Sequence, residues 1–385
     1  MTAPSPAGTP EPMIRFRGVT KTYSGSAAPA VENLTLDVPR GSITVFVGPS
    51  GCGKTTSLRM INRMVEPSSG TITVDGQDVT AVPAATLRRS MGYVMQSSGL
   101  LPHRTVLDNI GTVPRLNGAS RAAARQRAAE LLATVGLDAD LGRRYPAQLS
   151  GGQQQRVGVA RALAADPPVL LMDEPFSAVD PVVRAELQDE LLRLQRELAK
   201  TIVFVTHDID EATLLGDRVA VFAEGGRLAQ YAPPEELLRA PRDEFVAAFV
   251  GRDRGFRHLS FQDGGAVRLH GVQILDPAQL ADPRVPVRDG WALAVDADRR
   301  PLGWVPAAAR GQVTAPEQLV PGGSIYPVGE SLRRALDSAL SSPSGLGVAV
   351  DRAGAVVGCI RPAEVLELIE RARMRRGRAR HGTAV

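Results

Sequence analysis

Short apolar stretches alternate with longer amphipathic ones over most of the chain. Ser120 can cap a helix that runs from about Arg121 to Val135 and ends before Gly136, and a second helix is predicted from Pro181 to Leu198. Mostly apolar runs of four or five residues, which are typical of buried strands, fall at Ile43–Val47, Val169–Met172, Ile202–Val205 and Val219–Phe222. This alternation predicts an α/β fold with a mostly parallel sheet.

The chain beyond residue 251 contains a duplicated pattern. Segments 290–296 and 303–305 recur 55 residues later as 345–351 and 358–360, with Gly, Ala, Val, Asp and Gly in the same places. Each copy predicts a strand, a turn that contains Asp, and a second strand. Helices flank the second copy: one starts at Pro362, and the other places on one face Leu332, Ala335, Leu336, Ala339 and Leu340. Two such units indicate a small α+β module, and the alternative is a coincidence between two hairpins.

The predicted domain boundaries follow from these patterns. Residues 13–251 form the α/β domain, which closes with helices over residues 233–250, and Asp253–Gly255 is predicted to be a hinge into the duplicated module, residues 252–370. Residues 1–12, which contain four prolines, are expected to be a disordered lead. Residues 371–385 form a tail with six arginines from Arg371 to Arg380, either a solvated chain end or a contact with an anionic membrane surface.

Composition narrows the classes of function. The chain has 385 residues, and its 45 basic and 41 acidic residues give a net charge of +4, which is not a nucleic-acid-binding signature, so no nucleic acid is expected as a partner. Cys52 and Cys359 suggest neither a disulfide framework nor a zinc site. No apolar run approaches the ~18 residues of a membrane span. We therefore expect a cytoplasmic protein that reaches a membrane only through a partner.

The strongest chemical signal follows the predicted strand Ile43–Val47. The sequence there fits G-x-x-x-x-G-K-[ST], a loop whose backbone N–H groups surround a phosphate at the start of a helix. Glycines let the loop curl, Lys54 can reach the β- and γ-phosphates, and the Thr55 hydroxyl can bind Mg²⁺. A chance glycine-rich turn is the alternative. The expected nucleotide-binding residues of this loop are Gly48, Pro49, Ser50, Gly51, Cys52, Gly53, Lys54, Thr55 and Thr56.

Two carboxylates follow the predicted strand Val169–Met172. Asp173 suits Mg²⁺, and Glu174 is placed to polarise a water for in-line attack on the γ-phosphate. The alternative is a pair of ordinary charges at the start of a helix. The phosphate-binding loop (P-loop) at residues 48–55 makes that alternative less favoured.

A second phosphate-facing pattern lies at Leu149–Gln154, where Ser150, Gly151, Gly152 and Gln153 open a helix. One nucleotide does not need two such loops in one chain. We therefore expect this loop to serve a nucleotide held by a second copy, in a head-to-tail homodimer with two shared sites.

Over about residues 13–251, these motifs together resemble the nucleotide-binding subunit of an ATP-binding cassette (ABC) transporter. Gly48–Thr55 resembles Walker A, Leu170–Glu174 resembles Walker B, and Leu149–Gln153 matches the LSGGQ signature. The resemblance implies ATP and Mg²⁺ as ligands and Glu174 as the catalytic carboxylate. It also implies the P-loop ABC fold, with a helical subdomain and an antiparallel β subdomain beside the mostly parallel sheet.

The same resemblance implies roles for four residues outside those motifs. His207 resembles the switch histidine that contacts the γ-phosphate, and Gln96 resembles the Q-loop glutamine, a metal ligand that links the site to the membrane subunit. Tyr23 resembles the aromatic residue that stacks on adenine. Asp180 lies in a segment that resembles the D-loop, with Val179 where leucine is usual.

Further resemblances indicate an importer. Segment 99–110 resembles that of importers that dock a permease helix there, and segment 251–255 resembles the linker of glycine betaine/proline/choline importers, in which tandem cystathionine-β-synthase-type (CBS) repeats follow. The resemblance therefore implies an ATPase that powers uptake of an osmoprotectant: proline or a quaternary amine such as glycine betaine, choline or carnitine. Its partners would be separate membrane permease subunits and, indirectly, an extracytoplasmic solute-binding protein, and it would lie on the inner face of the membrane.

Three alternatives stay open at this point: the same ATPase serving another solute such as an amino acid or a sulfonate, a soluble ABC ATPase of translation or repair, and a C-terminal module that only stabilises the dimer. Arg361 and Glu364 stand where nucleotide-binding CBS repeats have Thr or Ser and then Asp. Ionic-strength or membrane-charge sensing is therefore the hypothesis kept for this module.

Overall fold

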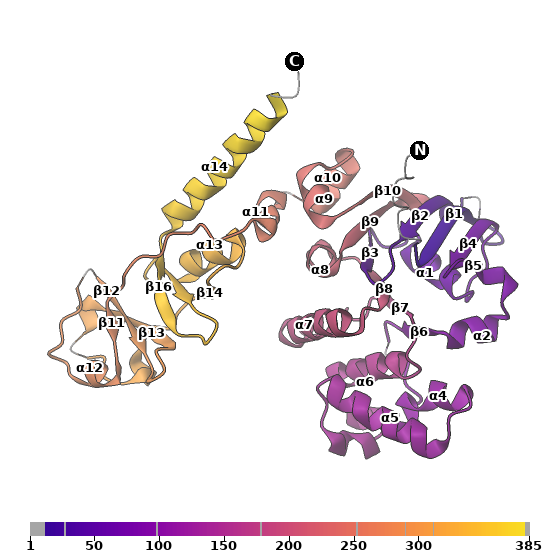
Figure 1. Ribbon diagram of the computed structural model, residues 1–385, viewed down its shortest axis with the longest axis horizontal. Coiled ribbons are helices and arrows are strands. Elements are labelled where there is room, and N and C mark those ends of the chain that lie inside the picture. The colour runs from indigo at the N-terminus through magenta and orange to yellow at the C-terminus, as the bar shows by residue number, and fades with distance from the viewer. Residues whose placement is uncertain are drawn as a thin grey trace, which may run out of the picture. The chain divides into compact units, whose positions relative to one another are not determined.

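The chain folds into two compact units, residues 1–252 and residues 253–385, in a computed structural model (Figure 1). The structure describes residues 12–381 apart from residues 27, 98, 178, 252, 289 and 311, and from residue 372 onward it describes the backbone alone. The predicted N-terminal lead therefore lies almost wholly outside the described residues, as does the end of the predicted tail.

A six-stranded sheet forms the centre of the first unit, in the order β10-β9-β3-β8-β7-β6. Every neighbouring pair is parallel except β9 and β10, which confirms the predicted mostly parallel sheet. The four predicted strands are all present. The strands are β3 (Ile43–Val47), β6 (Met91–Val94), β7 (Val169–Asp173), β8 (Thr201–Thr206), β9 (Arg218–Ala223) and β10 (Arg227–Ala232).

A second, antiparallel sheet covers one face of the first unit, in the order β2-β1-β4-β5. Its apolar side shares a core with helix α1 (Lys54–Ile61) and with the central sheet, where the Phe46 ring lies 5.1 Å from that of Phe222 and 6.4 Å from that of Phe16. This core fixes the helix that follows the P-loop. The strands are β1 (Ile14–Lys21), β2 (Val31–Val38), β4 (Ser69–Val74) and β5 (Gln77–Asp78).

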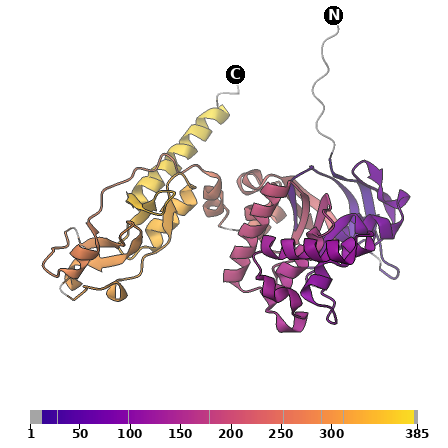
Figure 2. The same ribbon diagram turned by 60° about the horizontal axis from the view of Figure 1, so that its bottom comes forward.

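Helices pack on the opposite face of the central sheet and extend from it (Figure 2). The two predicted helices are confirmed as α5 (Arg121–Thr134), which Ser120 caps through the Ala123 N–H at 3.1 Å, and α7 (Pro181–Leu198). The predicted closing helices are α9 (Pro234–Arg239) and α10 (Glu244–Val250). The others are α2 (Ala84–Arg89), α3 (Val106–Ile110), α4 (Thr112–Leu116), α6 (Gly151–Leu163) and α8 (Ile209–Leu215), with 3₁₀ turns at Val79–Ala81, Ala139–Arg143, Pro146–Gln148 and Glu224–Gly226.

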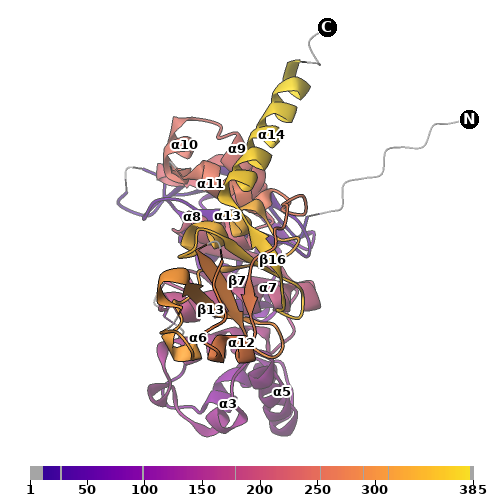
Figure 3. The same ribbon diagram turned by 90° about the vertical axis from the view of Figure 1, so that its left-hand side faces the viewer.

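The second unit contains the predicted duplication as two three-stranded sheets with the same topology, β11-β12-β13 and β14-β15-β16 (Figure 3). In each sheet the first pair is parallel and the second antiparallel. The strands are β11 (Ile274–Leu275), β12 (Trp291–Val295), β13 (Pro301–Pro306), β14 (Ile325–Pro327), β15 (Gly347–Val350) and β16 (Val356–Ile360). The helices are α11 (Arg254–His258), α12 (Pro277–Ala281), α13 (Leu332–Ser341) and α14 (Pro362–His381), with 3₁₀ turns at Leu259–Phe261, Ala307–Ala309 and Pro316–Gln318.

The two copies also agree in detail. Ala294 pairs with Gly303 and Ala349 with Gly358, and an irregularity follows each pair at the next position. Asp296 and Asp351 close the equivalent turns, since each carboxylate accepts hydrogen bonds from two N–H groups in the turn. Side chains of both sheets form one core, so the duplication is a structural repeat.

Three sequence-based expectations need correction or comment. Helix α11 begins at Arg254, so the expected hinge at Asp253–Gly255 is partly helical. Leu340 is 65% exposed, whereas the other four residues of its predicted face are buried. Helix α14 runs through residue 371 without a break, so the tail continues a helix of the module as far as His381. Within the described part of the chain, no helix is long and apolar enough to cross a membrane.

Candidate nucleotide site

The glycine-rich loop joins the buried strand β3 to helix α1, which begins at Lys54. Gly51 has φ +77° and Gly53 has φ +95°, values that residues with a side chain rarely adopt. A Cβ atom on Gly53 would lie 2.3 Å from the Ala30 carbonyl oxygen, whereas one on Gly51 would meet nothing within 4 Å. The loop thus packs closely on one side and is open at Gly51, as a phosphate cradle requires.

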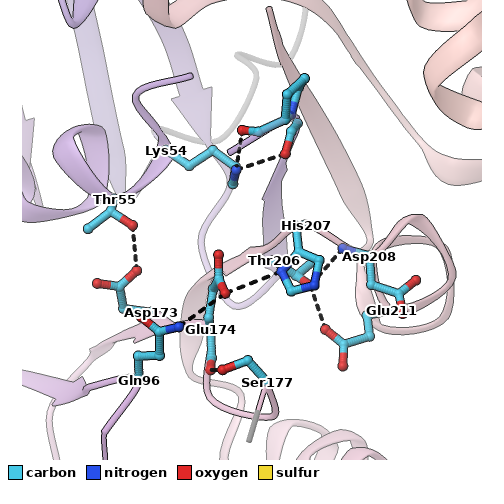
Figure 4. A network of polar contacts seen from close by, with 12 residues as sticks. Lys54, Thr55, Gln96, Asp173, Glu174, Ser177, Thr206, His207, Asp208 and Glu211 are labelled. Carbon is cyan, nitrogen blue, oxygen red and sulfur yellow. Dashed lines mark hydrogen bonds and ion pairs between the residues drawn. The ribbon is translucent and has the colours of Figure 1, made fainter. Parts of the chain in front are cut away.

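Lys54 is buried, and its Nζ donates hydrogen bonds to the carbonyl oxygens of Gly48 and Pro49, both at 2.8 Å (Figure 4). Among the residues that the structure describes, no carboxylate pairs with this ammonium group. A buried charge without a counter-charge is unfavourable unless an anion supplies one. The site is therefore suited to the phosphates of a nucleotide.

Thr55 and Asp173 form the second part of the site. The Thr55 Oγ1 donates a hydrogen bond of 2.7 Å to Asp173 Oδ1, and the Asp173 side chain, at the end of β7, is only 5% exposed. Hydroxyl and carboxylate oxygens are ligands that Mg²⁺ accepts beside phosphate. The two side chains thus fit a magnesium ion in this place.

Arg59 and Tyr93 also contact Asp173, and neither was predicted from the sequence. Arg59 Nη2 lies 3.3 Å from Asp173 Oδ2, and the Tyr93 hydroxyl donates to the same oxygen at 3.2 Å. Burial raises the pKa of Tyr93 to about 12, so the phenol remains a hydrogen-bond donor at neutral pH. Their positions, on α1 after Lys54 and three residues before Gln96, were the available signals.

Glu174, His207 and Gln96 lie together in the structure (Figure 4). His207 Nδ1 lies 3.2 Å from Glu174 Oε2, and Gln96 Nε2 lies 3.4 Å from the same oxygen. Glu174 has φ +45°, an unfavourable conformation for a residue with a side chain, and its N–H donates to the Val205 carbonyl oxygen at 3.0 Å. Ser177 Oγ donates to the Glu174 carbonyl oxygen. These bonds hold Glu174 in place where the strands of the central sheet have their carboxyl ends.

The predicted second loop opens helix α6. Ser150 Oγ accepts a hydrogen bond from the Gln153 N–H, and Gln153 Oε1 accepts one from the Ser150 N–H, so the two residues cap the helix. A Cβ atom on Gly152 would lie 2.8 Å from Val183 Cγ1, so this glycine lets α6 approach α7. Gly151 has open space around it.

Three further candidates have local roles in the structure. Asp180 caps helix α7 by accepting from the N–H groups of Val182 and Val183, and Tyr23 is 45% exposed beneath the Lys21 ammonium. Cys52 is buried, and burial raises the pKa of its thiol. Within the described residues, no hydrogen bond or ion pair joins Tyr23, Asp180 or the 150–153 loop to Lys54, Asp173 or Glu174.

A phosphate loop at the end of β3 and a carboxylate pair at the end of β7, two strands away in the same sheet, suit the binding and hydrolysis of a nucleoside triphosphate. The fold and the site together define a P-loop nucleoside triphosphatase of the α/β class. Comparison with known proteins narrows this class. A family model described as "ABC transporter" matches residues 31–177.

Curated relatives and solved structures agree with that match. The osmoprotectant import ATP-binding protein OsmV of Salmonella typhimurium is 48% identical over 307 residues, 76% of this chain and 79% of that protein. The glycine betaine/carnitine/choline transport ATP-binding protein OpuCA of Bacillus subtilis is 50% identical over 242 residues, 63% of each chain. The dimeric ATP-binding cassette MJ0796, in a post-hydrolysis state with ADP and Pi, is 34% identical with a TM-score of 0.54, over 58% of this chain and 99% of that one.

The chain therefore belongs to the family of ABC transporter ATP-binding proteins, in the group whose members serve osmoprotectant uptake systems, and it binds ATP. This confirms the resemblance inferred from the motifs. The family model does not extend to the second unit, so the identity of its repeats as CBS repeats stays a prediction.

Proposed function

We propose that this protein hydrolyses ATP to power the uptake of a quaternary-amine osmoprotectant through separate permease subunits at the inner face of the membrane. The main support is one structural observation: the neighbouring strands β6, β7 and β8 end near Gln96, Asp173, Glu174 and His207, and Asp173 is bonded to Thr55 just after the phosphate loop. The names of OsmV and OpuCA support the class of solute.

The chain's own residues account for the chemistry. Residues 48–56, with Lys54, bind the β- and γ-phosphates, and Tyr23 stacks on the adenine. A bound Mg²⁺, held by Thr55 and Asp173 and reached by Gln96, would neutralise charge on the phosphate oxygens. Glu174 accepts a proton from the attacking water, and His207 and Gln96 hold its carboxylate oriented.

Two copies of the chain share each nucleotide in this proposal. Residues 150–153 and Asp180 of the second copy complete the site that Lys54 and Asp173 of the first begin. The support is that these segments have no hydrogen bond to the phosphate loop within the described residues of one chain, and that the MJ0796 relative is dimeric. The conformational change on closure of the dimer would be transmitted to the permease near Gln96.

Solute uptake into vesicles that carry the full importer tests the proposed solute class. We expect ATP-dependent accumulation of radiolabelled glycine betaine, choline or carnitine, and no accumulation with Lys54→Ala, which removes the phosphate-binding ammonium. Accumulation of only a sulfonate or an amino acid other than proline would agree with the proposed ATPase function but would overturn the proposed class of solute.

For the second unit we propose a CBS-like regulatory module that senses ionic strength or membrane charge. The repeated topology supports a CBS-like module. One observation disfavours nucleotide sensing: Glu364 Oε1 lies 2.5 Å from His270 Nε2, so one oxygen of the carboxylate at this position is already bonded within the chain. The Arg-rich segment from Arg371 to Arg380 would contact anionic lipid, although the side chains after Arg371 lie outside the described residues.

Deletion of residues 371–385 tests that module. We expect the deletion to remove the dependence of transport on salt and on anionic lipid while transport itself continues. An unchanged salt dependence would leave the module with the role of stabilising the dimer.

A further inference from the structure

A buried polar cluster lies directly behind His207. The preceding residue, Thr206, is 2% exposed, and its Oγ1 donates a hydrogen bond of 2.6 Å to Glu211 Oε2 (Figure 4). The same hydroxyl oxygen accepts a bond of 3.0 Å from the Asp208 N–H. The hydroxyl thus joins the residues on both sides of His207 to one carboxylate.

The other oxygen of that carboxylate faces helix α7. Glu211 Oε1 accepts a hydrogen bond of 3.2 Å from Gln188 Nε2, and Arg184 Nε lies 4.0 Å away. Gln188 and Glu211 are both buried. Helix α7 begins just after Asp180, so this cluster connects the end of β8, helix α8 and the helix that follows the D-loop segment.

Burial of a carboxylate in this place is unfavourable for the stability of the fold. Burial raises the pKa of the Glu211 carboxyl, which reflects the loss of hydration by its charged form. An apolar residue of similar size would fill the space without that penalty. The carboxylate is nevertheless bonded on both oxygens, as expected of a group that fixes the geometry of its neighbours.

We propose that Glu211 is a positioning residue of the ATPase site, which holds Thr206, and with it the backbone that carries His207, at a fixed place relative to helix α7. The inference rests on the proposed ATPase function. Because His207 Nδ1 lies 3.2 Å from Glu174 Oε2, a shift of about 1 Å in this backbone would break their contact. Because helix α7 is bonded to the same cluster, a displacement of α7 would also shift the backbone that carries His207.

Steady-state kinetics of the full-length protein in its reconstituted transporter test this proposal. Glu211→Leu and Thr206→Val should each lower kcat about tenfold or more, since small displacements of a catalytic group have effects of this size. The KM for ATP should change by less than about twofold, because the phosphate-binding loop is untouched. Thr206→Ser keeps the hydroxyl and should retain the wild-type kcat.

Gln230→Leu is the matched control, because Gln230 is also buried and its hydrogen bonds go to the backbone of Ala240 and Arg242. This variant should lower the melting temperature without lowering kcat. If Glu211→Leu does not fold, the comparison of Thr206→Val with Thr206→Ser still decides.

NMR with ¹³C-labelled histidine provides a second readout. The His207 resonance, assigned by its loss in His207→Gln, should move in Thr206→Val and stay in place in Gln230→Leu. Wild-type kcat in both Glu211→Leu and Thr206→Val, or an equal loss in Gln230→Leu, would overturn the positioning role. A wild-type complex without ATPase activity would instead overturn the proposed function itself.

Discussion

His207 Nδ1 lies 3.2 Å from Glu174 Oε2, and the parallel sheet creates this contact. Strands β7 and β8 are neighbours in register, with Asp173 opposite Val205, so the residues that follow both strands emerge side by side. The Glu174 N–H donates to the Val205 carbonyl oxygen, which extends the pairing by one residue. The proposed reacting carboxylate is thus fixed by backbone register.

Replacement of Glu174 by Gln tests the proposed role of this carboxylate. The variant keeps the shape of the side chain and its contacts with His207 and Gln96, but it cannot accept a proton from water. We expect ATP binding to remain and turnover to fall by about 10² or more. The ATP-bound protein should accumulate as a closed dimer, which size-exclusion chromatography with and without ATP would detect. A variant that stays monomeric at saturating ATP would contradict the shared site.

The Tyr93 hydroxyl should matter for magnesium. Tyr93→Phe removes the bond to Asp173 Oδ2 and leaves Thr55 and Arg59 as the other partners of that carboxylate. Loss of one hydrogen bond to a charged group predicts that half-maximal ATPase activity needs about tenfold more Mg²⁺ or still more. Tyr231→Phe is the control, since it removes a hydroxyl bonded to the Asp37 carbonyl oxygen. An equal effect in both variants would show a general loss of packing.

The phosphate loop should be far less tolerant at Gly53 than at Gly51. Both residues have positive φ, but a Cβ atom at Gly53 would also collide with the Ala30 carbonyl oxygen at 2.3 Å. Gly51→Ala should therefore destabilise the protein by about 1 kcal/mol from backbone strain alone, and Gly53→Ala by more. Calorimetric unfolding of the two variants measures the difference. Equal destabilisation would mean that the loop does not pack against residue 30 as described.

Glu211 predicts a specific pH dependence of stability. Burial raises its pKa in the folded state above the ordinary value of 4.5. Between these two pKa values the folded state keeps a proton that the unfolded state has released, so stability falls as pH rises through this window. Glu211→Gln does not titrate, so its melting temperature relative to wild type should rise with pH from about 4.5 and then level off. A difference that stays constant between pH 4 and pH 8 would contradict a buried carboxyl here.

The sequence predicted four central strands of the ATPase unit, because they are almost wholly buried, and its two long helices, which carry clear end signals. It did not locate the strands of the antiparallel sheet, in which buried and exposed residues are mixed. The helix predicted from about Pro181 to Leu198 has these bounds in the structure, where Asp180 caps it. The phosphate loop and the acidic strand end were found from spacing along the chain. The duplicated turns were found because the same residues recur 55 positions apart, and Asp296 and Asp351 make equivalent local hydrogen bonds in the structure.

Contacts between distant elements could not be predicted in this way. Arg59 and Tyr93 meet Asp173 only because α1, β6 and β7 pack together, and Gln188 meets Glu211 only through the packing of α7. Local composition also misled: glycine and aspartate at 253–255 suggested a hinge where helix α11 begins, and Leu340 fits the apolar period of α13 but lies near its end, where it is exposed.

The most direct test of the account is the ATPase activity of the reconstituted importer, with and without glycine betaine-loaded binding protein, across a range of ionic strength. The account predicts hydrolysis that requires the loaded binding protein, rises with salt and is lost in Glu174→Gln. The contradicting result would be ATPase activity that glycine betaine and other quaternary amines leave unchanged but that a different solute stimulates. This result would overturn the osmoprotectant role of the ATPase.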